Sequence, residues 1–308
     1  MNRKAILMGS ISVVALAAVA TAAQAQDESV PDGFSVSIEG GALFGTNTVA
    51  EDKLGSAPSG GIVNIQDNLG YRAAIALGKR IDPFWDLRVT GALNHQLSST
   101  SDYSFSGGGS GFYGEMITDF DYETLDFEAG YRPMLTDTMD VRLFAGLRGL
   151  HYKDSVDKMG AAYISGGGDK IGYGIEANQE FFGVGPRIGI EASAPLGDSM
   201  FGVSGMLAGA ALFGTNRTNG EASFFSGASG GTVPIPGQEE QVTVYSLEAA
   251  LGLDMHVNES ATVTLGYRAE GLFGIENIFS NLSGGSGGSG SDSRWTHGPT
   301  LKLTGYFD

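Results

Sequence analysis

The segment Trp85-Asp86-Leu87-Arg88-Val89-Thr90-Gly91-Ala92-Leu93-Asn94 alternates two kinds of side chain. Its odd-numbered positions are apolar or glycine, and its even-numbered positions are charged, polar or small. Successive side chains of a β-strand point to opposite faces, so the segment predicts a strand with one apolar and one polar face. Such a strand could cover a soluble core. With the strand lengths and export signal described below, we interpret the apolar face as lipid-facing and the polar face as lumenal.

Nine further segments carry strand patterns, and most of the ten hold 11 to 17 residues. A usual globular strand has about five or six residues, whereas a strand that crosses an outer membrane at a tilt needs about 9–11. The predicted strands are residues 34–44, 69–81, 84–98, 118–132, 139–152, 174–194, 200–215, 241–257, 261–275 and 294–307. Their lengths favour a membrane-spanning barrel over a β-sandwich.

The connections between these strands alternate strictly between short and long. The short ones are residues 82–83, 133–138, 195–199 and 258–260; the long ones are 45–68, 99–117, 153–173, 216–240 and 276–293. Bacterial barrels place short turns in the periplasm and long loops outside the cell. We therefore expect an all-β fold, a transmembrane antiparallel up-and-down β-barrel of about ten strands. The number becomes eight or twelve if region 153–173 or 216–240 is misassigned.

The N-terminus has the anatomy of a secretory signal peptide. Arg3 and Lys4 precede an apolar run over residues 5–20, and Ala23-Gln24-Ala25 is a small-x-small cleavage site. A membrane anchor is the competing interpretation, but the run is shorter than the roughly 20 residues that a spanning helix needs. We expect a cleaved signal peptide at residues 1–25 and one outer-membrane barrel domain at residues 26–308.

Charge and composition exclude several classes of function. Without the signal peptide the chain has 16 basic and 35 acidic residues, a net charge of −19. Nucleic acids and anionic membrane surfaces are therefore poor partners. The absence of cysteine excludes disulfides, thiolate metal sites and cysteine nucleophiles. Aromatic residues near the predicted strand ends, Phe34, Phe84, Trp85, Tyr131, Phe201, Trp295 and Phe307, suit interfacial girdles.

The alternation also predicts which charged residues face the lumen. The basic ones are Arg72, Arg80, Arg88, Arg132, Arg142, Arg148, Arg187, Arg268 and Lys302. The acidic ones are Glu39, Asp86, Asp126, Glu128, Glu191, Glu248, Asp254 and Glu270. These groups could form a charged constriction that selects solutes by sign and size. They could equally pair across a narrow interior and plug it, and both interpretations stay open.

Catalytic and metal-binding motifs are sparse. His95 with Ser98 or Ser99 could support hydrolysis, yet His95 falls in phase with the lipid-facing residues near a strand end, where an interfacial role fits better. Asp119, Asp121 and Glu123 share one strand face, a spacing that could hold a hard cation, but they lack a calcium-loop pattern. We expect no enzyme activity, no cofactor and no metal.

Four stretches together resemble the Legionella-type major outer membrane protein family of pore-forming barrels: residues 119–132, 144–148, 182–189 and 297–303. The third contains Gly185-Pro186-Arg187-Ile188-Gly189, an unusual sequence for a strand. The resemblance implies porin-like permeability, with Asp126, Glu128, Arg132, Arg148 and Arg187 inward. This chain departs from the family in two respects. It has no cysteine for the disulfide-linked assemblies of the founding members, and its terminal aromatic, Phe307, is penultimate.

The expected function is an outer-membrane pore that lets small hydrophilic solutes or ions pass passively. The alternative is a closed structural or surface-interaction barrel without significant conductance, because loops of 18 to 25 residues exceed what joining strands requires. A lipid-modifying enzyme ranks third. The expected partners are outer-membrane lipids, the barrel-assembly machinery during insertion and a possible non-covalent homo-oligomer.

Overall fold

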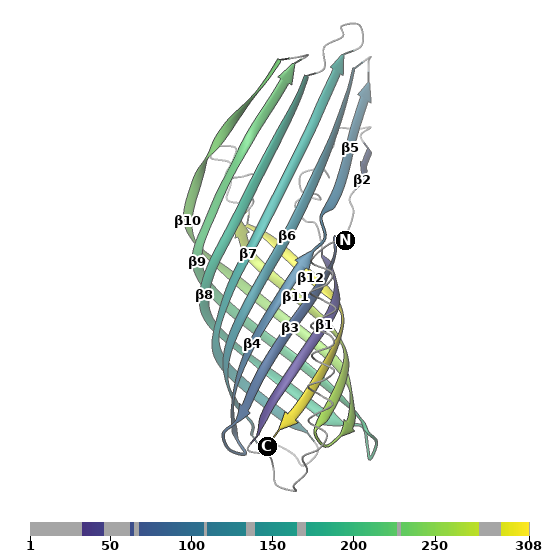
Figure 1. The fold of residues 1–308 in the computed structure, drawn as a ribbon, viewed down its shortest axis with the longest axis vertical. Coiled ribbons are helices and arrows are strands. Elements are labelled where there is room, and N and C mark those ends of the chain that lie inside the picture. The colour runs from purple at the N-terminus through teal and green to yellow at the C-terminus, as the bar shows by residue number, and fades with distance from the viewer. Residues whose placement is uncertain are drawn as a thin grey trace.

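The computed structural model describes residues 33–45, 62–64, 68–107, 110–133, 139–164, 171–226, 229–276 and 291–307, which hold twelve β-strands (Figure 1). They are β1 Phe34–Gly45, β2 Ile62–Asn64, β3 Asn68–Arg80, β4 Trp85–Gln96, β5 Ser99–Gly107, β6 Ser110–Tyr131, β7 Asp140–Ile164, β8 Ile171–Pro195, β9 Phe201–Ser226, β10 Ser229–Asn258, β11 Ala261–Glu276 and β12 Ser291–Phe307. No helix in these ranges is long and apolar enough to cross a membrane. The predicted signal peptide, residues 1–25, lies outside the described residues.

Ten of these twelve strands close into an antiparallel ring. Their order is β6, β4, β3, β1, β12, β11, β10, β9, β8 and β7, and β7 pairs with β6 to complete it. The first and last strands are neighbours, with Phe34 of β1 opposite Phe307 of β12. Strand β5 continues the line of β4: His95 lies opposite Asp121 of β6, and Ser99 lies opposite Thr118. The predicted ten-stranded up-and-down barrel is confirmed.

Four strands run well past their predicted ends. Strands β6, β7, β9 and β10 have 22, 25, 26 and 30 residues, whereas β1, β3 and β4 have 12 or 13. The prediction of loops at residues 99–117, 153–173 and 216–240 was therefore wrong, because most of these residues extend β5 to β10. Of the other predicted loops, 45–68 contains β2, and its remaining interior lies largely outside the described residues, as does that of 276–293.

These residues were predicted as loops because the alternation of apolar side chains ends at the edge of the lipid-facing surface. The backbone hydrogen bonds between neighbouring strands nevertheless continue beyond that edge. The pairing of β9 with β10 runs from Phe201 opposite Met255 to Ser226 opposite Ser229, with one irregularity near Ile235. In Figure 1 strands β5 to β10 rise beyond the ends of β1, β3, β11 and β12 and form a curved sheet, which we call the tall wall.

The predicted inward and outward faces are confirmed in the ring. On β4, Leu87 and Leu93 are 50% and 51% exposed, whereas Asp86 and Asn94 are 8% and 3% exposed. The apolar side chains thus point away from the barrel and the polar ones point into it. A soluble protein would not leave this apolar surface uncovered, so the arrangement is that of a lipid-facing barrel.

Short turns and exposed aromatic side chains mark one end of the barrel. The Asp82 carboxylate accepts hydrogen bonds from the backbone N–H groups of Phe84 and Trp85, at 2.7 and 2.8 Å, and so holds the turn between β3 and β4. Between β8 and β9, Gly197 has a φ of 63°, a left-handed conformation that favours glycine. At the same end the rings of Trp85 and Tyr131 lie 5.1 Å apart on neighbouring strands, as an interfacial girdle requires.

Candidate functional site

The inward side chains of the ring meet in a single group of ion pairs, which we call the lumenal ion network. Twelve of the fourteen predicted site residues belong to it: Arg72, Arg88, Asp126, Glu128, Arg132, Arg142, Arg148, Arg187, Glu191, Glu248, Arg268 and Glu270, joined by Glu39 and Asp86. These fourteen described members comprise seven guanidinium groups and seven carboxylates. The formal charges of these fourteen residues therefore cancel.

Arg148 of β7 stands at its centre. Its Nε and Nη2 both bind Asp126 at 2.7 Å, in a bidentate pair. Its Nη1 lies 3.2 Å from Glu270 of β11 and also contacts Glu248 of β10. Arg187 of β8 shares the same carboxylates, with Nη1 2.5 Å from Glu248. These side chains are at most 4% exposed, so water does not screen the pairs.

Further pairs extend the network toward both sides of the barrel. Below the centre, the side chain of Arg142, 1% exposed, lies 2.8 Å from Asp86, 3.1 Å from Glu128 and 3.4 Å from Glu191. Arg88 binds Glu191 at 2.5 Å.

Toward β1 and β3, Arg268 lies 2.8 Å from Glu248 and 3.4 Å from Glu39, and Arg72 binds Glu39 at 2.8 Å. Arg132 joins Asp86 at 3.1 Å and also pairs with Asp140. Every strand of the ring except β9 and β12 thus contributes to the network.

Above the network the interior is apolar. Ten side chains, each at most 9% exposed, pack together there and form what we call the apolar layer: Phe120, Tyr122, Leu150, Tyr152, Phe181, Ala210, Leu212, Val244, Leu272 and Ile275. The rings of Tyr152 and Phe181 stack with centroids 5.2 Å apart, and Phe120 lies 5.8 Å from Tyr152. This layer was not predicted from the sequence. Tyr152 and Phe181 were assigned to strands, but their side chains were not placed on the inward face.

Two contacts join strands that lie on opposite sides of the ring. The Tyr122 hydroxyl of β6 donates a hydrogen bond to Glu270 of β11 at 2.9 Å. Arg294 of β12 donates to Asp154 of β7 at 2.6 Å, with both side chains 3% exposed. In each pair the strands are five places apart in the ring of ten. We call these two contacts the cross-barrel contacts, and they span the lumen at the level of the apolar layer.

The lumenal ion network itself lines a polar cavity of about 910 Å³ on its short-turn side, with Arg142, Arg148 and Glu248 among the lining residues. Its lining reaches the short turns at Pro83, Pro133 and Pro195, and it contains no residue of the apolar layer. The two remaining predicted site residues, Arg80 and Lys302, line this cavity and form no ion pair with a described carboxylate. The described lumen thus has a polar cavity at the short-turn end, and buried ion pairs and apolar side chains lie beyond it.

Among the described side chains, His95 forms no hydrogen bond with Ser98, and the side chain of Ser99 is not among those described. His95 points outward and its Nδ1 contacts Asp121, while the hydroxyl of Ser98 donates a 3.4 Å hydrogen bond to Asp119. His95 also packs against Tyr71, with ring centroids 5.1 Å apart. The outward position agrees with the interfacial placement expected from the sequence.

Comparisons with known proteins support the fold and the compartment. Among solved structures, the outer membrane protease OmpT of Escherichia coli matches with a TM-score of 0.51 and 13% identity, covering 92% of this chain and 99% of OmpT. At this identity the likeness shows the fold alone. A major outer membrane protein from Thermus thermophilus matches with a TM-score of 0.31 and 15% identity, covering 89% of this chain and 99% of that protein. A search of curated proteins found no match.

The family match is more extensive. The model of the family described as Legionella pneumophila major outer membrane protein precursor matches residues 92–303, more than half of the chain. Together with the barrel fold, the match places the protein in the outer membrane, as predicted from the sequence. The resemblance stated on residues 119–132, 144–148, 182–189 and 297–303 is confirmed, and the chain belongs to the Legionella pneumophila major outer membrane protein family.

Proposed function

We propose that this protein is a closed outer-membrane barrel without significant conductance, and that its tall wall carries a structural or surface-interaction function outside the cell. The observation that carries this proposal is that the two cross-barrel contacts extend across the lumen. Tyr122 reaches Glu270 and Arg294 reaches Asp154, each from the opposite side of the ring.

The lumenal ion network supports the same conclusion. Selective pores present unpaired charges or carbonyls that replace part of an ion's hydration shell. Here the seven guanidinium groups are already bound to seven carboxylates, and a passing ion would have to break those pairs. A buried charge that loses its partner is strongly destabilising, by about 3–5 kcal/mol. Above the network, the large side chains of the apolar layer occupy the lumen, and a hydrated ion would have to displace them.

The tall wall supports the surface function. Strands β5 to β10 continue beyond the lipid-facing ring as a hydrogen-bonded sheet rather than as separate loops (Figure 1). Exposed apolar side chains on this extension include Tyr113, Met159, Phe224 and Val233, each close to half exposed. Such side chains on a rigid sheet provide a contact surface for another macromolecule. The proposal includes no catalytic step or cofactor. The proposed partners are outer-membrane lipids, the barrel-assembly machinery and further copies of this chain in a non-covalent homo-oligomer.

Planar lipid bilayers test the proposal directly. The folded mature protein, verified by its heat-modifiable electrophoretic mobility, should give no discrete single-channel current. The variant Tyr122→Ala/Phe181→Ala removes one cross-barrel contact and two large side chains of the apolar layer, so it should show channel openings under the same conditions. Discrete, ion-selective openings of the unmodified protein would refute the proposal.

A passive pore for small hydrophilic solutes is the second candidate. The polar cavity of about 910 Å³ favours it, because part of a permeation path already exists at the short-turn end. If this candidate is right, Arg80 and Lys302, which line the cavity without ion pairs to described carboxylates, favour anions. The reversal potential of the unmodified protein under a salt gradient would then lie on the anion-selective side and shift in the variant Lys302→Gln.

A further inference from the structure

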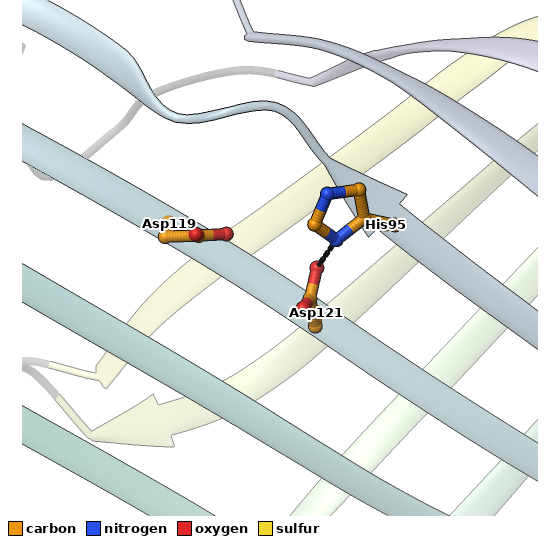
Figure 2. A group of neighbouring side chains, drawn as sticks. All are labelled: His95, Asp119 and Asp121. Atoms are coloured by element: carbon orange, nitrogen blue, oxygen red, sulfur yellow. Dashed lines mark hydrogen bonds and ion pairs between the residues drawn. The ribbon is translucent and has the colours of Figure 1, made fainter. Parts of the chain in front are cut away.

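Three potential metal ligands gather on the outer surface of the barrel, outside the lumen. They are His95 at the end of β4 and Asp119 and Asp121 on β6 (Figure 2). One imidazole nitrogen and one oxygen from each carboxylate all lie within 4.8 Å of one another. Figure 2 shows both carboxylates beside the imidazole ring, with Asp121 joined to it by the marked contact. We call these residues the His95 cluster.

The strand register explains why they meet. His95 lies directly opposite Asp121 in the β4–β6 ladder, and Asp119 is two residues from Asp121, on the same outward face. Toward the membrane, the next outward residues are Leu93 of β4 and Glu123 of β6, which lie opposite each other, and Leu125 follows on β6. Leu93 and Leu125 are 51% and 47% exposed. The His95 cluster therefore sits where the lipid-facing apolar surface ends. The ring of Tyr71, 5.1 Å from that of His95, restrains the imidazole from a third strand.

Hydrogen bonding inside the cluster leaves one carboxylate oxygen unexplained. Among the described residues, Oδ1 of Asp119 is buried and has no hydrogen-bond partner, and Oδ2 accepts only the 3.4 Å bond from Ser98. A buried acceptor without a partner is unfavourable by about 1–3 kcal/mol, more for a charged group, and in native proteins it often marks an ion-binding position. Asp119 also forms no ion pair with a described lysine or arginine.

We propose that His95, Asp119 and Asp121 bind one divalent metal ion of the zinc class at the outer membrane interface. The donor set points to this class because imidazole is a good ligand for zinc and related transition metals, whereas calcium and magnesium take oxygen ligands. Three protein ligands leave at least one position open, and water completes the coordination from the solvent side. The ion would bind the orphaned oxygen of Asp119 and join strands β4 and β6 where β4 ends.

A second histidine provides a matched control on the same outer surface. His151 of β7 contacts Glu180 of β8 at 2.7 Å, so it repeats the imidazole–carboxylate pair. There, however, Lys153 lies 3.7 Å from the same carboxylate and supplies the positive charge, and the pair is not part of a three-ligand group among the described residues. We expect no comparable metal binding at His151.

Isothermal titration calorimetry of the folded, chelator-treated mature protein in detergent micelles, with zinc chloride as titrant, tests the proposal. We expect saturable binding of one zinc ion per chain. The variants His95→Gln and Asp119→Asn should each weaken it at least tenfold, whereas His151→Gln should leave it unchanged. Cobalt chloride should give a visible absorption band in the unmodified protein and in His151→Gln only.

Each variant is first checked for heat-modifiable mobility, and Asp119→Asn serves if His95→Gln does not fold. The proposal is overturned if the unmodified protein shows no saturable zinc binding up to millimolar concentration. It is overturned equally if His151→Gln weakens binding as much as His95→Gln, or if magnesium competes with zinc at equal concentration.

Discussion

Replacing Arg148 with methionine tests whether the lumenal ion network is a structural element of the barrel. Arg148 binds Asp126 through two bonds of 2.7 Å and also contacts Glu248 and Glu270. Methionine keeps most of the apolar volume and removes the guanidinium group. The network would then hold seven carboxylates and six guanidinium groups, and the former partners of Arg148 are themselves buried.

The magnitude follows from the burial of the pairs. Arg148, Asp126, Glu248 and Glu270 have side chains at most 4% exposed. Removing one partner of a buried ion pair typically reduces stability by about 3–5 kcal/mol, because the remaining charge is buried without compensation. We expect Arg148→Met to lower the free energy of unfolding by this amount. An exposed pair contributes about 0–1 kcal/mol. Arg217 and Glu239, 66% and 58% exposed and 3.3 Å apart, form such a pair.

The assay is unfolding by urea in lipid vesicles, followed by the fluorescence of Trp85 and Trp295 and analysed by linear extrapolation. Arg217→Met is the control and should change the free energy of unfolding by less than about 1 kcal/mol. The double variant Arg148→Met/Asp126→Asn restores the charge balance, so its loss should be smaller than the sum of the single losses. If Arg148→Met and Arg217→Met lose the same stability, the network does not stabilise the barrel and the reasoning is wrong.

Three further predictions concern the same structure. Gly146→Ala should destabilise the barrel by about 1–3 kcal/mol, because the added Cβ would lie 1.9 Å from a backbone oxygen of β6. Gly91→Ala should have little effect in the same unfolding assay, because a Cβ at that position would meet open space. Arg294→Gln and Asp154→Asn should each lower the free energy of unfolding, and a double-mutant cycle should give a coupling of about 0.5–3 kcal/mol, since the two residues bind at 2.6 Å. An additive cycle would contradict this contact. Raising sodium chloride from about 0.1 to 1 M should abolish the stability change caused by Arg217→Met and leave that caused by Arg148→Met, because salt screens exposed charges far more than buried ones. Equal screening of both stability changes would show that water reaches Arg148 and its partners.

The inward positions were predictable because the side-chain period of a strand is two residues. Once Leu87 and Leu93 are assigned to the lipid, Arg88 and Asn94 must face the lumen, and the same rule placed Asp126, Arg148 and Glu248 correctly. Family membership was visible in residues 119–132, which lie within the matched range. The ends of β7, β9 and β10 were not predictable, because above the lipid no apolar alternation marks a strand.

The cross-barrel contacts could not be derived from the sequence either. Tyr122 and Glu270 are 148 residues apart, and Arg294 and Asp154 are 140 apart. Each pair meets only because ring closure puts β6 opposite β11 and β7 opposite β12. No local pattern carries that information, since it depends on the number of strands and on their stagger.

Local sequence patterns were thus enough to predict an up-and-down barrel of about ten strands, the inward direction of its charged side chains and the family. These properties follow from side-chain periodicity and from residue type. Only the folded chain showed that seven guanidinium groups meet seven carboxylates, that apolar side chains pack together above them, and that His95 meets Asp119 and Asp121. The physical reason is that pairing across a barrel or between neighbouring strands depends on which strands lie side by side and in what register.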